Sequence, residues 1–154
     1  MRPALLIALV VTLAGTPRPL EITGPVAVFD LDDETSTLPA LTVKKLSARA
    51  RARLVHKGLR LVPHASLKAK IDRLAPGRAC KDLGCQTEVA SELGAAAIVR
   101  TRVVPVVDGC EIYVGVHRLN EPPLVSTASA AGGCHPKELR KLMTRAVDRL
   151  VPLR

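Results

Sequence analysis

The 154-residue chain is almost without aromatic side chains: it has no Trp, and Phe29 and Tyr113 are its only Phe and Tyr. Proteins that bind single-stranded nucleic acid stack the bases on several aromatic side chains. Two aromatic residues are too few for such a surface, so we expect no nucleic-acid partner. The same scarcity argues against a carbohydrate-binding cleft. The hydrophobic core must be built from Val, Leu, Ile and Ala.

Sequence motifs for common catalytic chemistry are also missing. There is no G-x-S-x-G nucleophile elbow, no H-x-x-x-H metal spacing and no C-x-x-C thiol-exchange motif. We therefore predict that the protein is not an enzyme, and we expect no cofactor. The four histidines are interpreted as surface or partly packed side chains: His56, His64, His117 and His135.

One apolar run stands out, at residues 4–14 after the positive charge of Arg2. It is shorter than the roughly 20 residues of a membrane-spanning helix, and Thr12 and Ala14 are small residues suited to a cleavage site. This pattern is typical of a secretory signal peptide, with an uncleaved anchor as the alternative. Thr16 stands where a bacterial lipoprotein would have its lipid-bearing Cys. We predict a signal peptide at 1–14, a spacer at 15–24 and a single domain at 25–154, which would not be an integral membrane protein after cleavage.

Four cysteines follow the predicted signal peptide: Cys80, Cys85, Cys110 and Cys134. We expect a periplasmic or secreted protein, and in an oxidising compartment an even number of cysteines indicates disulfides rather than metal ligands. Zinc binding by Cys85 with His64, or by Cys134 with His135, is the alternative.

Hydrophobic periodicity predicts nine elements in the order β-α-β-α-α-β-β-β-α. The predicted strands are 25–31, 59–63, 95–107, 110–119 and 124–131, and the predicted helices are 38–57, 64–74, 82–93 and 136–151. Right-handed crossovers place successive helices on opposite faces of one sheet. The predicted fold class is therefore α/β, with a five-stranded mixed sheet in the order 2-1-3-4-5 and helices on both faces.

The last predicted hairpin suggests how the cysteines pair. Folding the chain about residues 120–123 brings Cys110 to within about one residue of Cys134 on the neighbouring strand. Facing residues of antiparallel strands lie about as far apart as a disulfide requires. Three pairings can be drawn from four cysteines, and we favour Cys110 with Cys134, which leaves Cys80 with Cys85 as a local pair.

The chain has a formal net charge of +9 at pH 7. An exported basic protein can contact an anionic surface or an acidic protein. Within the predicted helix 38–57, Val43, Leu46, Ala50 and Leu54 share one face. The remaining faces carry a candidate partner surface of six cations, with an ordinary solvated helix as the alternative. These cations are Lys44, Lys45, Arg49, Arg51, Arg53 and Lys57.

Four acids follow the first predicted strand: Asp30, Asp32, Asp33 and Glu34. Ligands of open α/β sheets bind beyond the carboxyl ends of the strands, so this acidic loop is a candidate site for a divalent metal. The alternative is a solvated loop whose acids favour the N-terminus of the next helix. The loop does not have the spacing of an EF-hand.

Three stretches carry a resemblance to known proteins: PVAVFDLDD at 25–33, GLRLVPHASLKAKI at 58–71 and CQTEVASELGAAAIVRTRV at 85–103. Over about residues 24–151 the chain resembles the TolB amino-terminal-like and CsgG-like group of bacterial envelope domains. Members of that group include secretion-channel subunits, synthase-activating lipoproteins and proteins of the trans-envelope Tol system. The chain lacks a lipobox Cys, a β-propeller and a transmembrane hairpin region, which argues against a channel.

The resemblance implies a non-catalytic protein that acts through contacts with other proteins. We therefore expect an exported envelope adaptor or accessory module, with one or more envelope proteins as partners. The alternative is a periplasmic protein that binds a small ligand or a divalent metal through the acidic loop.

Overall fold

The fold is described from a computed structural model, in which residues 21–119 and 125–150 are placed. The predicted signal peptide and the loop at 120–123 lie outside these ranges. Within them, no helix is both long enough and apolar enough to span a bilayer. The elements are β1 (Val26–Val28), β2 (Asp32–Asp33), α1 (Ala40–His56), α2 (His64–Leu74), α3 (Leu83–Glu92), β3 (Ala97–Val106), β4 (Gly109–Arg118), β5 (Val125–Gly132) and α4 (Pro136–Arg149).

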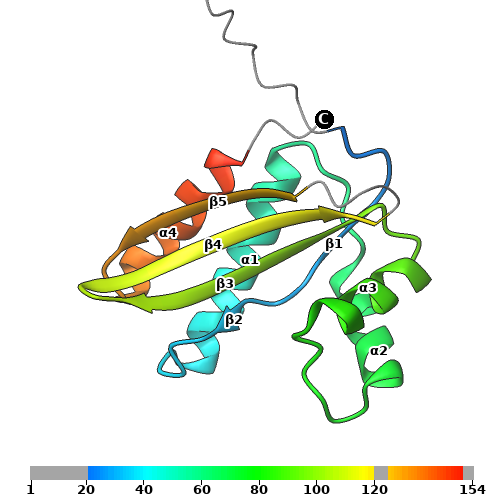
Figure 1. The fold of residues 1–154 in the computed structure, drawn as a ribbon, viewed down its shortest axis with the longest axis horizontal. Coiled ribbons are helices and arrows are strands. Elements are labelled where there is room, and N and C mark those ends of the chain that lie inside the picture. The colour runs from blue at the N-terminus through cyan, green and yellow to red at the C-terminus, as the bar shows by residue number, and fades with distance from the viewer. Residues whose placement is uncertain (1–20, 120–124, 151–154) are drawn as a thin grey trace, which may run out of the picture.

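The strands form a five-stranded mixed sheet, which confirms the predicted α/β class (Figure 1). β1 and β2 both pair with β3 in parallel. β3, β4 and β5 form an antiparallel meander. The order is β1-β3-β4-β5, with β2 also bonded to β3. The predicted positions of the four helices and of the meander agree with the structure to within a few residues.

The predicted strand at 59–63 is wrong as a strand. Its place beside β1 is taken by a single parallel bridge between Val26 and Leu61, with two backbone bonds from Val26 N to Arg60 O and from Val62 N to Val26 O. Pairing stops there because β1 is only three residues long and because Pro63 lacks an N–H and directly precedes α2. The fifth strand is β2 instead, in a segment that the sequence suggested to be loop.

Each face of the sheet carries its own core. On one face, α1 and α4 pack on Val26, Val28 and Val99, and we call this the α1–α4 core. On the other face, Ala27 and Ile98 pack with residues of α2 and α3 in the α2–α3 core. Figure 1 shows α1 and α4 behind the sheet and α2 and α3 grouped beside the end where β1 lies. The helices therefore lie on both faces, as predicted.

The segment between β1 and β2 contains one residue more than the stretch of β3 that it faces. Val28 is opposite Val99, whereas Asp32 is opposite Arg102. Residues 29–31 therefore face only two residues of β3, which is the arrangement of a β-bulge. Accordingly, Phe29 belongs to the α2–α3 core and Leu31 to the α1–α4 core, although residues two apart in a regular strand share a face.

The structure joins Cys110 to Cys134 and Cys80 to Cys85, with Cα–Cα distances of 5.1 and 5.6 Å. Cys110 is opposite Gly132, so the register differs by one residue from the predicted one, and the same two cysteines still meet. Cys110 lies in the α1–α4 core and Cys80 in the α2–α3 core. Each disulfide is thus attached to a different core.

Candidate functional site

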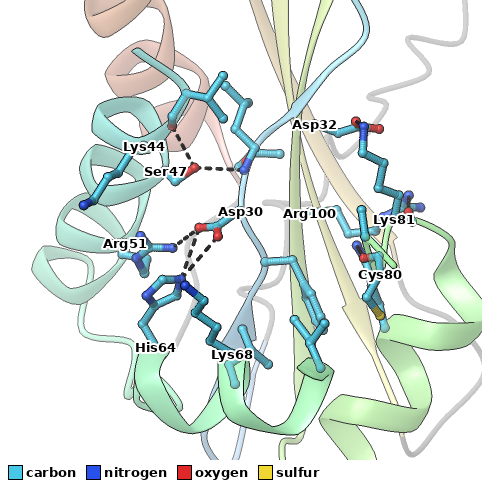
Figure 2. A pocket seen from close by; sticks show the side chains of 18 of the residues that line it. Asp30, Asp32, Lys44, Ser47, Arg51, His64, Lys68, Cys80, Lys81 and Arg100 are labelled. Carbon is cyan, nitrogen blue, oxygen red and sulfur yellow. Dashed lines mark hydrogen bonds and ion pairs between the residues drawn. The ribbon is translucent and has the colours of Figure 1, made fainter. Parts of the chain in front are cut away.

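A cavity of about 580 Å³ opens at the carboxyl end of β1. Its walls come from α1, from α2, from β3, from residues 29–32 of the bulged segment and from the segment that precedes α3. Figure 2 shows Arg51 and His64 on one side of Asp30, with Lys81 and Arg100 on the other. The carboxyl end of a parallel strand at the point where the chain crosses over is the usual ligand position in open α/β sheets.

The position of the bulged segment depends on Ser47. This side chain is only 1% exposed, and its Oγ accepts a hydrogen bond from Leu31 N at 2.9 Å while donating to Val43 O at 2.9 Å. The bond to Leu31 supplies a partner for a backbone N–H that the bulge removes from the sheet. It ties the wall of the cavity to α1.

Asp30 is the carboxylate at the mouth of the cavity. Arg51 Nη1 donates to Asp30 Oδ1 at 2.8 Å, and His64 Nε2 lies 3.2 Å from the same oxygen. Partial burial raises the pKa of Asp30. Arg51 and His64 lower this pKa by more than burial raises it, so the net pKa lies below its ordinary value. Asp30 is therefore an ionised group held between two side chains from different helices.

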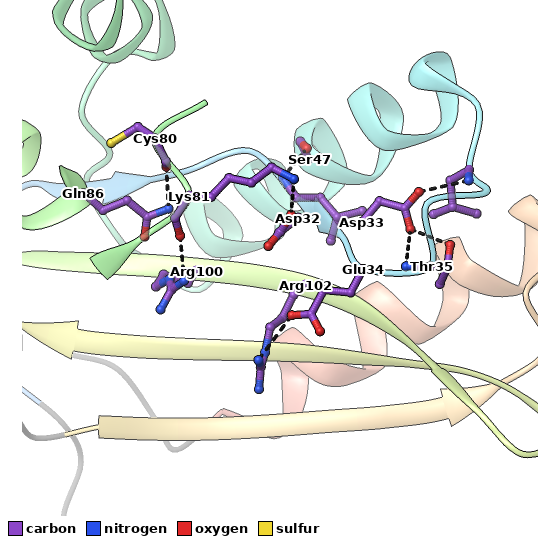
Figure 3. A network of polar contacts seen from close by, with 12 residues as sticks. Asp32, Asp33, Glu34, Thr35, Ser47, Cys80, Lys81, Gln86, Arg100 and Arg102 are labelled. Carbon is purple, nitrogen blue, oxygen red and sulfur yellow. Dashed lines mark hydrogen bonds and ion pairs between the residues drawn. The ribbon is translucent and has the colours of Figure 1, made fainter. Parts of the chain in front are cut away.

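The other three acids of the acidic loop turn to different partners (Figure 3). Asp32 accepts from Lys81 Nζ at 2.7 Å, and Glu34 accepts from Arg102 at 3.3 Å. Asp33 instead accepts from the backbone N–H groups of Thr35 and Leu38 at 3.0 and 2.9 Å. Burial raises the pKa of Asp33, but the Thr35 hydroxyl and the backbone N–H groups together lower it by more, so the net pKa lies below its usual range.

These contacts do not assemble the divalent-metal site that the sequence suggested for Asp30, Asp32, Asp33 and Glu34. Each carboxylate is used by a cation or by backbone donors. Among residues 21–119 and 125–150, no three His, Cys, Asp or Glu side chains are grouped so as to hold a metal ion. The structure also contradicts the zinc alternatives for Cys85 and Cys134. All four cysteine sulfur atoms are in disulfides, so no thiolate is free to bind zinc.

The six cations of the candidate partner surface on α1 do not form one free surface. Three of them face α4: Arg49 Nε donates to Thr144, Arg53 makes two bonds to the carboxylate of Asp148, and Lys57 reaches the carbonyl of the same residue. Arg51 and Lys44 line the cavity. Lys45 is exposed and makes no hydrogen bond or ion pair within the part of the chain that is placed.

Sequence reasoning missed several contributors to the cavity wall, among them Ser47, His64 and Lys68. His64 was interpreted as a surface residue because its nearest histidine is eight positions away. Its partner Asp30 is 34 positions away in the chain, and no local spacing could reveal that contact. The predicted helix at 64–74 does place this side chain at a helix N-terminus, and α2 begins at His64.

Beyond the cavity, one face of β4 and β5 is left uncovered by the part of the chain that the structure describes. Ile112, Val114 and Val116 point into the α1–α4 core, so the alternate residues point away from it. Among the residues placed, none from β4 or β5 belongs to the α2–α3 core. We call this surface the open sheet face, and it carries Arg102, Glu111, Tyr113, Thr127 and Ser129.

Side chains on the open sheet face are bonded to one another. Glu111 accepts from Ser129 Oγ at 2.6 Å and from Tyr113 Oη at 2.7 Å. These two bonds lower the pKa of Glu111. The Arg102 guanidinium lies over the Tyr113 ring at 5.2 Å. An ordered polar surface of this kind is well suited to a protein contact, because little side-chain entropy remains to be lost.

Comparison with known proteins places the fold among bacterial proteins. No family model matches the chain, and no curated protein matches it in sequence. The C-terminal domain of LpoB from Salmonella enterica is similar in structure, with a TM-score of 0.55 and 12% identity over 73% of this chain and 86% of that chain. LpoB from Escherichia coli is similar over 72% and 85%, at 13% identity and a TM-score of 0.54.

Lipoprotein GNA1162 from Neisseria meningitidis is also similar, with a TM-score of 0.51 and 15% identity over 72% of this chain and 82% of that chain. Sequence identity this low means that the likeness concerns the fold alone.

Proposed function

We propose that the protein is a non-catalytic accessory module of the bacterial cell envelope, exported to the periplasm and acting through contacts with envelope proteins. The observation that carries the proposal is the shared fold with the LpoB C-terminal domain and with lipoprotein GNA1162. A lipoprotein is a membrane-attached protein, so the fold occurs in envelope proteins. We further assign the chain to the TolB amino-terminal-like and CsgG-like group, on the strength of the three sequence stretches described above.

The two disulfides support export. Structural disulfides persist in oxidising compartments and are rare in the cytosol of mesophiles. In the placed part of the chain all four cysteines are paired, and none is free. Non-reducing peptide mapping of protein purified from its own host should recover the linked Cys80–Cys85 and Cys110–Cys134 peptides from the periplasmic fraction. Recovery of four free thiols would contradict export.

The open sheet face is a better partner surface than α1. The cations of α1 are largely engaged by α4 and by Asp30, so they have less free charge to offer than their number suggests. β5 ends the sheet in the strand order, and an end strand can accept an added strand from a partner. We therefore place the partner contact on the open sheet face and along β5.

Photocrosslinking in living cells tests this assignment. A benzophenone amino acid at exposed Thr127, on β5, should form a crosslink to a defined envelope protein. The matched position is exposed Lys45 on α1, where the same substitution should give no such product. A crosslink to a defined envelope protein from Lys45 and not from Thr127 would move the contact to α1. Absence of any crosslinked envelope protein from either position would contradict the proposed function.

A further inference from the structure

We propose that the cavity at the carboxyl end of β1 binds a small organic anion with an apolar body. This inference rests on the cavity alone and does not depend on the proposed protein contacts. It also differs from metal binding by the acidic loop, because the charge that the cavity presents is positive.

The cavity lining carries more positive than negative charge. Three acids line it, Asp30, Asp32 and Asp72, against six cations from α1, α2, β3 and the segment before α3. The six are Lys44, Arg51, Lys68, Lys81, Arg100 and Arg102. Clefts lined by one sign of charge concentrate ligands of the opposite sign. A small anion is the ligand that this excess favours.

Three of these cations have no carboxylate partner among the residues placed. Arg100 donates only to the carbonyl of Lys81, at 2.9 Å. Lys44 and Lys68 make no hydrogen bond or ion pair within residues 21–119 and 125–150. The three come from different elements, so the free positive charge reaches the cavity from several sides. Their charge is available to a ligand without breaking an existing pair.

The interior of the cavity is apolar. Phe29, Leu31 and Leu67 are at most 5% exposed and line it together with Val43 and Ile71. Ligand sites of about 300–1,000 Å³ with mostly apolar walls and a few polar groups suit small molecules. An inorganic ion would leave this apolar surface uncovered, so the ligand needs an apolar body.

Two buried polar atoms in the lining have no partner among residues 21–119 and 125–150. Thr101 is 2% exposed and Gln86 is 5% exposed, and within these ranges neither Thr101 Oγ1 nor Gln86 Oε1 has a hydrogen-bond partner. Gln86 is otherwise fixed, because its amide nitrogen donates to Cys80 O at 2.9 Å. A buried polar atom without a partner destabilises the folded state, because it has lost its hydrogen bonds to water. The Thr101 hydroxyl can donate to an oxygen of the bound anion, and Gln86 Oε1 can accept from a donor on the body of the ligand.

A fluorescent organic anion provides the direct test. Anilinonaphthalene sulfonate joins an apolar ring system to one sulfonate, and its emission rises on entering an apolar site. With the full-length protein we expect saturable binding at one site, at least about tenfold tighter than that of neutral phenyl-naphthylamine, because near-surface charge pairs contribute on this scale. Equal affinity for the two dyes, or no saturation at about 1 mM dye, would overturn the proposal.

Charge reversal then locates the site. Lys68→Glu should weaken binding of the anionic dye by about tenfold or more, whereas Lys137→Glu should leave it unchanged. Both lysines are exposed on helices, and only Lys68 lines the cavity. Unchanged affinity in Lys68→Glu overturns the proposal, and so does equal weakening in Lys137→Glu. If Lys68→Glu fails to fold, the isosteric Thr101→Val is compared with Lys137→Glu instead. Thr101→Val should then be the variant that weakens binding of the dye.

Competition identifies the class of ligand. Decanoate, a carboxylate with an apolar chain, should displace the dye. A short peptide of glutamates, which carries charge without an apolar body, should not displace it. Displacement by the peptide alone would replace the small-molecule site with a site for an acidic protein segment, and would overturn the proposal.

Discussion

Ser47 shows how one hydroxyl can position a whole segment. It provides the Leu31 N–H with a partner where the sheet does not. We expect Ser47→Ala to lower the free energy of unfolding by about 1–2 kcal/mol, because it leaves a buried donor unpaired. Ser91→Ala on α3 is the matched control, since Ser91 is exposed and the same substitution leaves no buried group behind. Urea denaturation measures both, and equal effects would contradict this role for Ser47.

Asp30 makes stability depend on pH. Its folded-state pKa is depressed, so its contribution is present above the pKa of the unfolded chain and is lost as the pH falls through the folded value. The contribution should be at most about 1 kcal/mol, because the Asp30 side chain is 59% exposed and water screens such pairs.

Asp30→Asn should therefore destabilise the protein at neutral pH and have a smaller effect in acid, where Asp30 becomes protonated. Thermal unfolding at both pH values measures the difference. Glu88→Gln removes an exposed carboxylate of α3 and should change little at either pH. An Asp30→Asn effect of the same size in acid would mean that packing, and not charge, is responsible.

Single residues of the site could be predicted from the sequence only in part. The position of Asp30 at a strand end follows from the apolar run before it, and the cations of α1 follow from its helical period. Which cation meets Asp30 does not follow, because Arg51 and His64 come from 21 and 34 positions away. No sequence pattern indicates that the Thr101 hydroxyl is buried without a hydrogen-bond partner among the placed residues.

At the scale of elements, α1 and α4 are joined by charge as well as by apolar packing. Arg53 makes a two-bond pair with Asp148, in which Arg53 lowers the pKa of Asp148. Arg53→Glu should lower the melting temperature, and adding Asp148→Arg should restore part of the loss because the opposite charges are then exchanged. Lys45→Glu on the same helix is the control and should have no such effect. Absence of rescue would show that the pair does not couple the helices.

The two disulfides should differ in what they contribute. Cys110–Cys134 closes a loop with a sequence separation of 24, and Cys80–Cys85 one of 5. Loop-closure entropy predicts stabilisation of about 3.5 and about 2 kcal/mol respectively. Paired Cys→Ala variants compared by urea denaturation should rank in that order. The reverse ranking would show that the short loop before α3 matters for more than chain entropy.

Elements with a clear period were predictable, and those set by tertiary pairing were not. The apolar faces of α1 and α4 and the alternation of β4 are visible in the sequence. The failed strand at 59–63 has β-forming residues, but its partner β1 is too short to extend the pairing. β2 was missed because Asp32 and Asp33 are poor strand residues, and they pair only because β3 continues beside them.

The whole molecule should unfold as one cooperative unit although it has two cores. Val26 and Val28 belong to the α1–α4 core while Ala27 and Phe29, from the same segment, belong to the α2–α3 core. Neither core can lose its strands without disturbing the other. Fluorescence of Tyr113, the only Tyr in a chain without Trp, reports on the sheet, and far-ultraviolet circular dichroism reports on the helices.

We expect the two signals to give the same urea midpoint, as for a two-state domain. An earlier transition in circular dichroism would show that α2 and α3 separate from the sheet first. In that case the cavity would be lost before the open sheet face, and the two binding surfaces could be studied apart.

The number of residues between β1 and β2 determines whether the bulge forms, because the bulge consists of one extra residue in this segment. Deleting one residue from 29–31 would allow β1 and β2 to run on as one unbroken strand beside β3, because the two registers differ by one. The same deletion would bring Phe29 or Leu31 to the opposite face, and the wall of the cavity would close. Insertions and deletions at this place would therefore create or abolish the cavity.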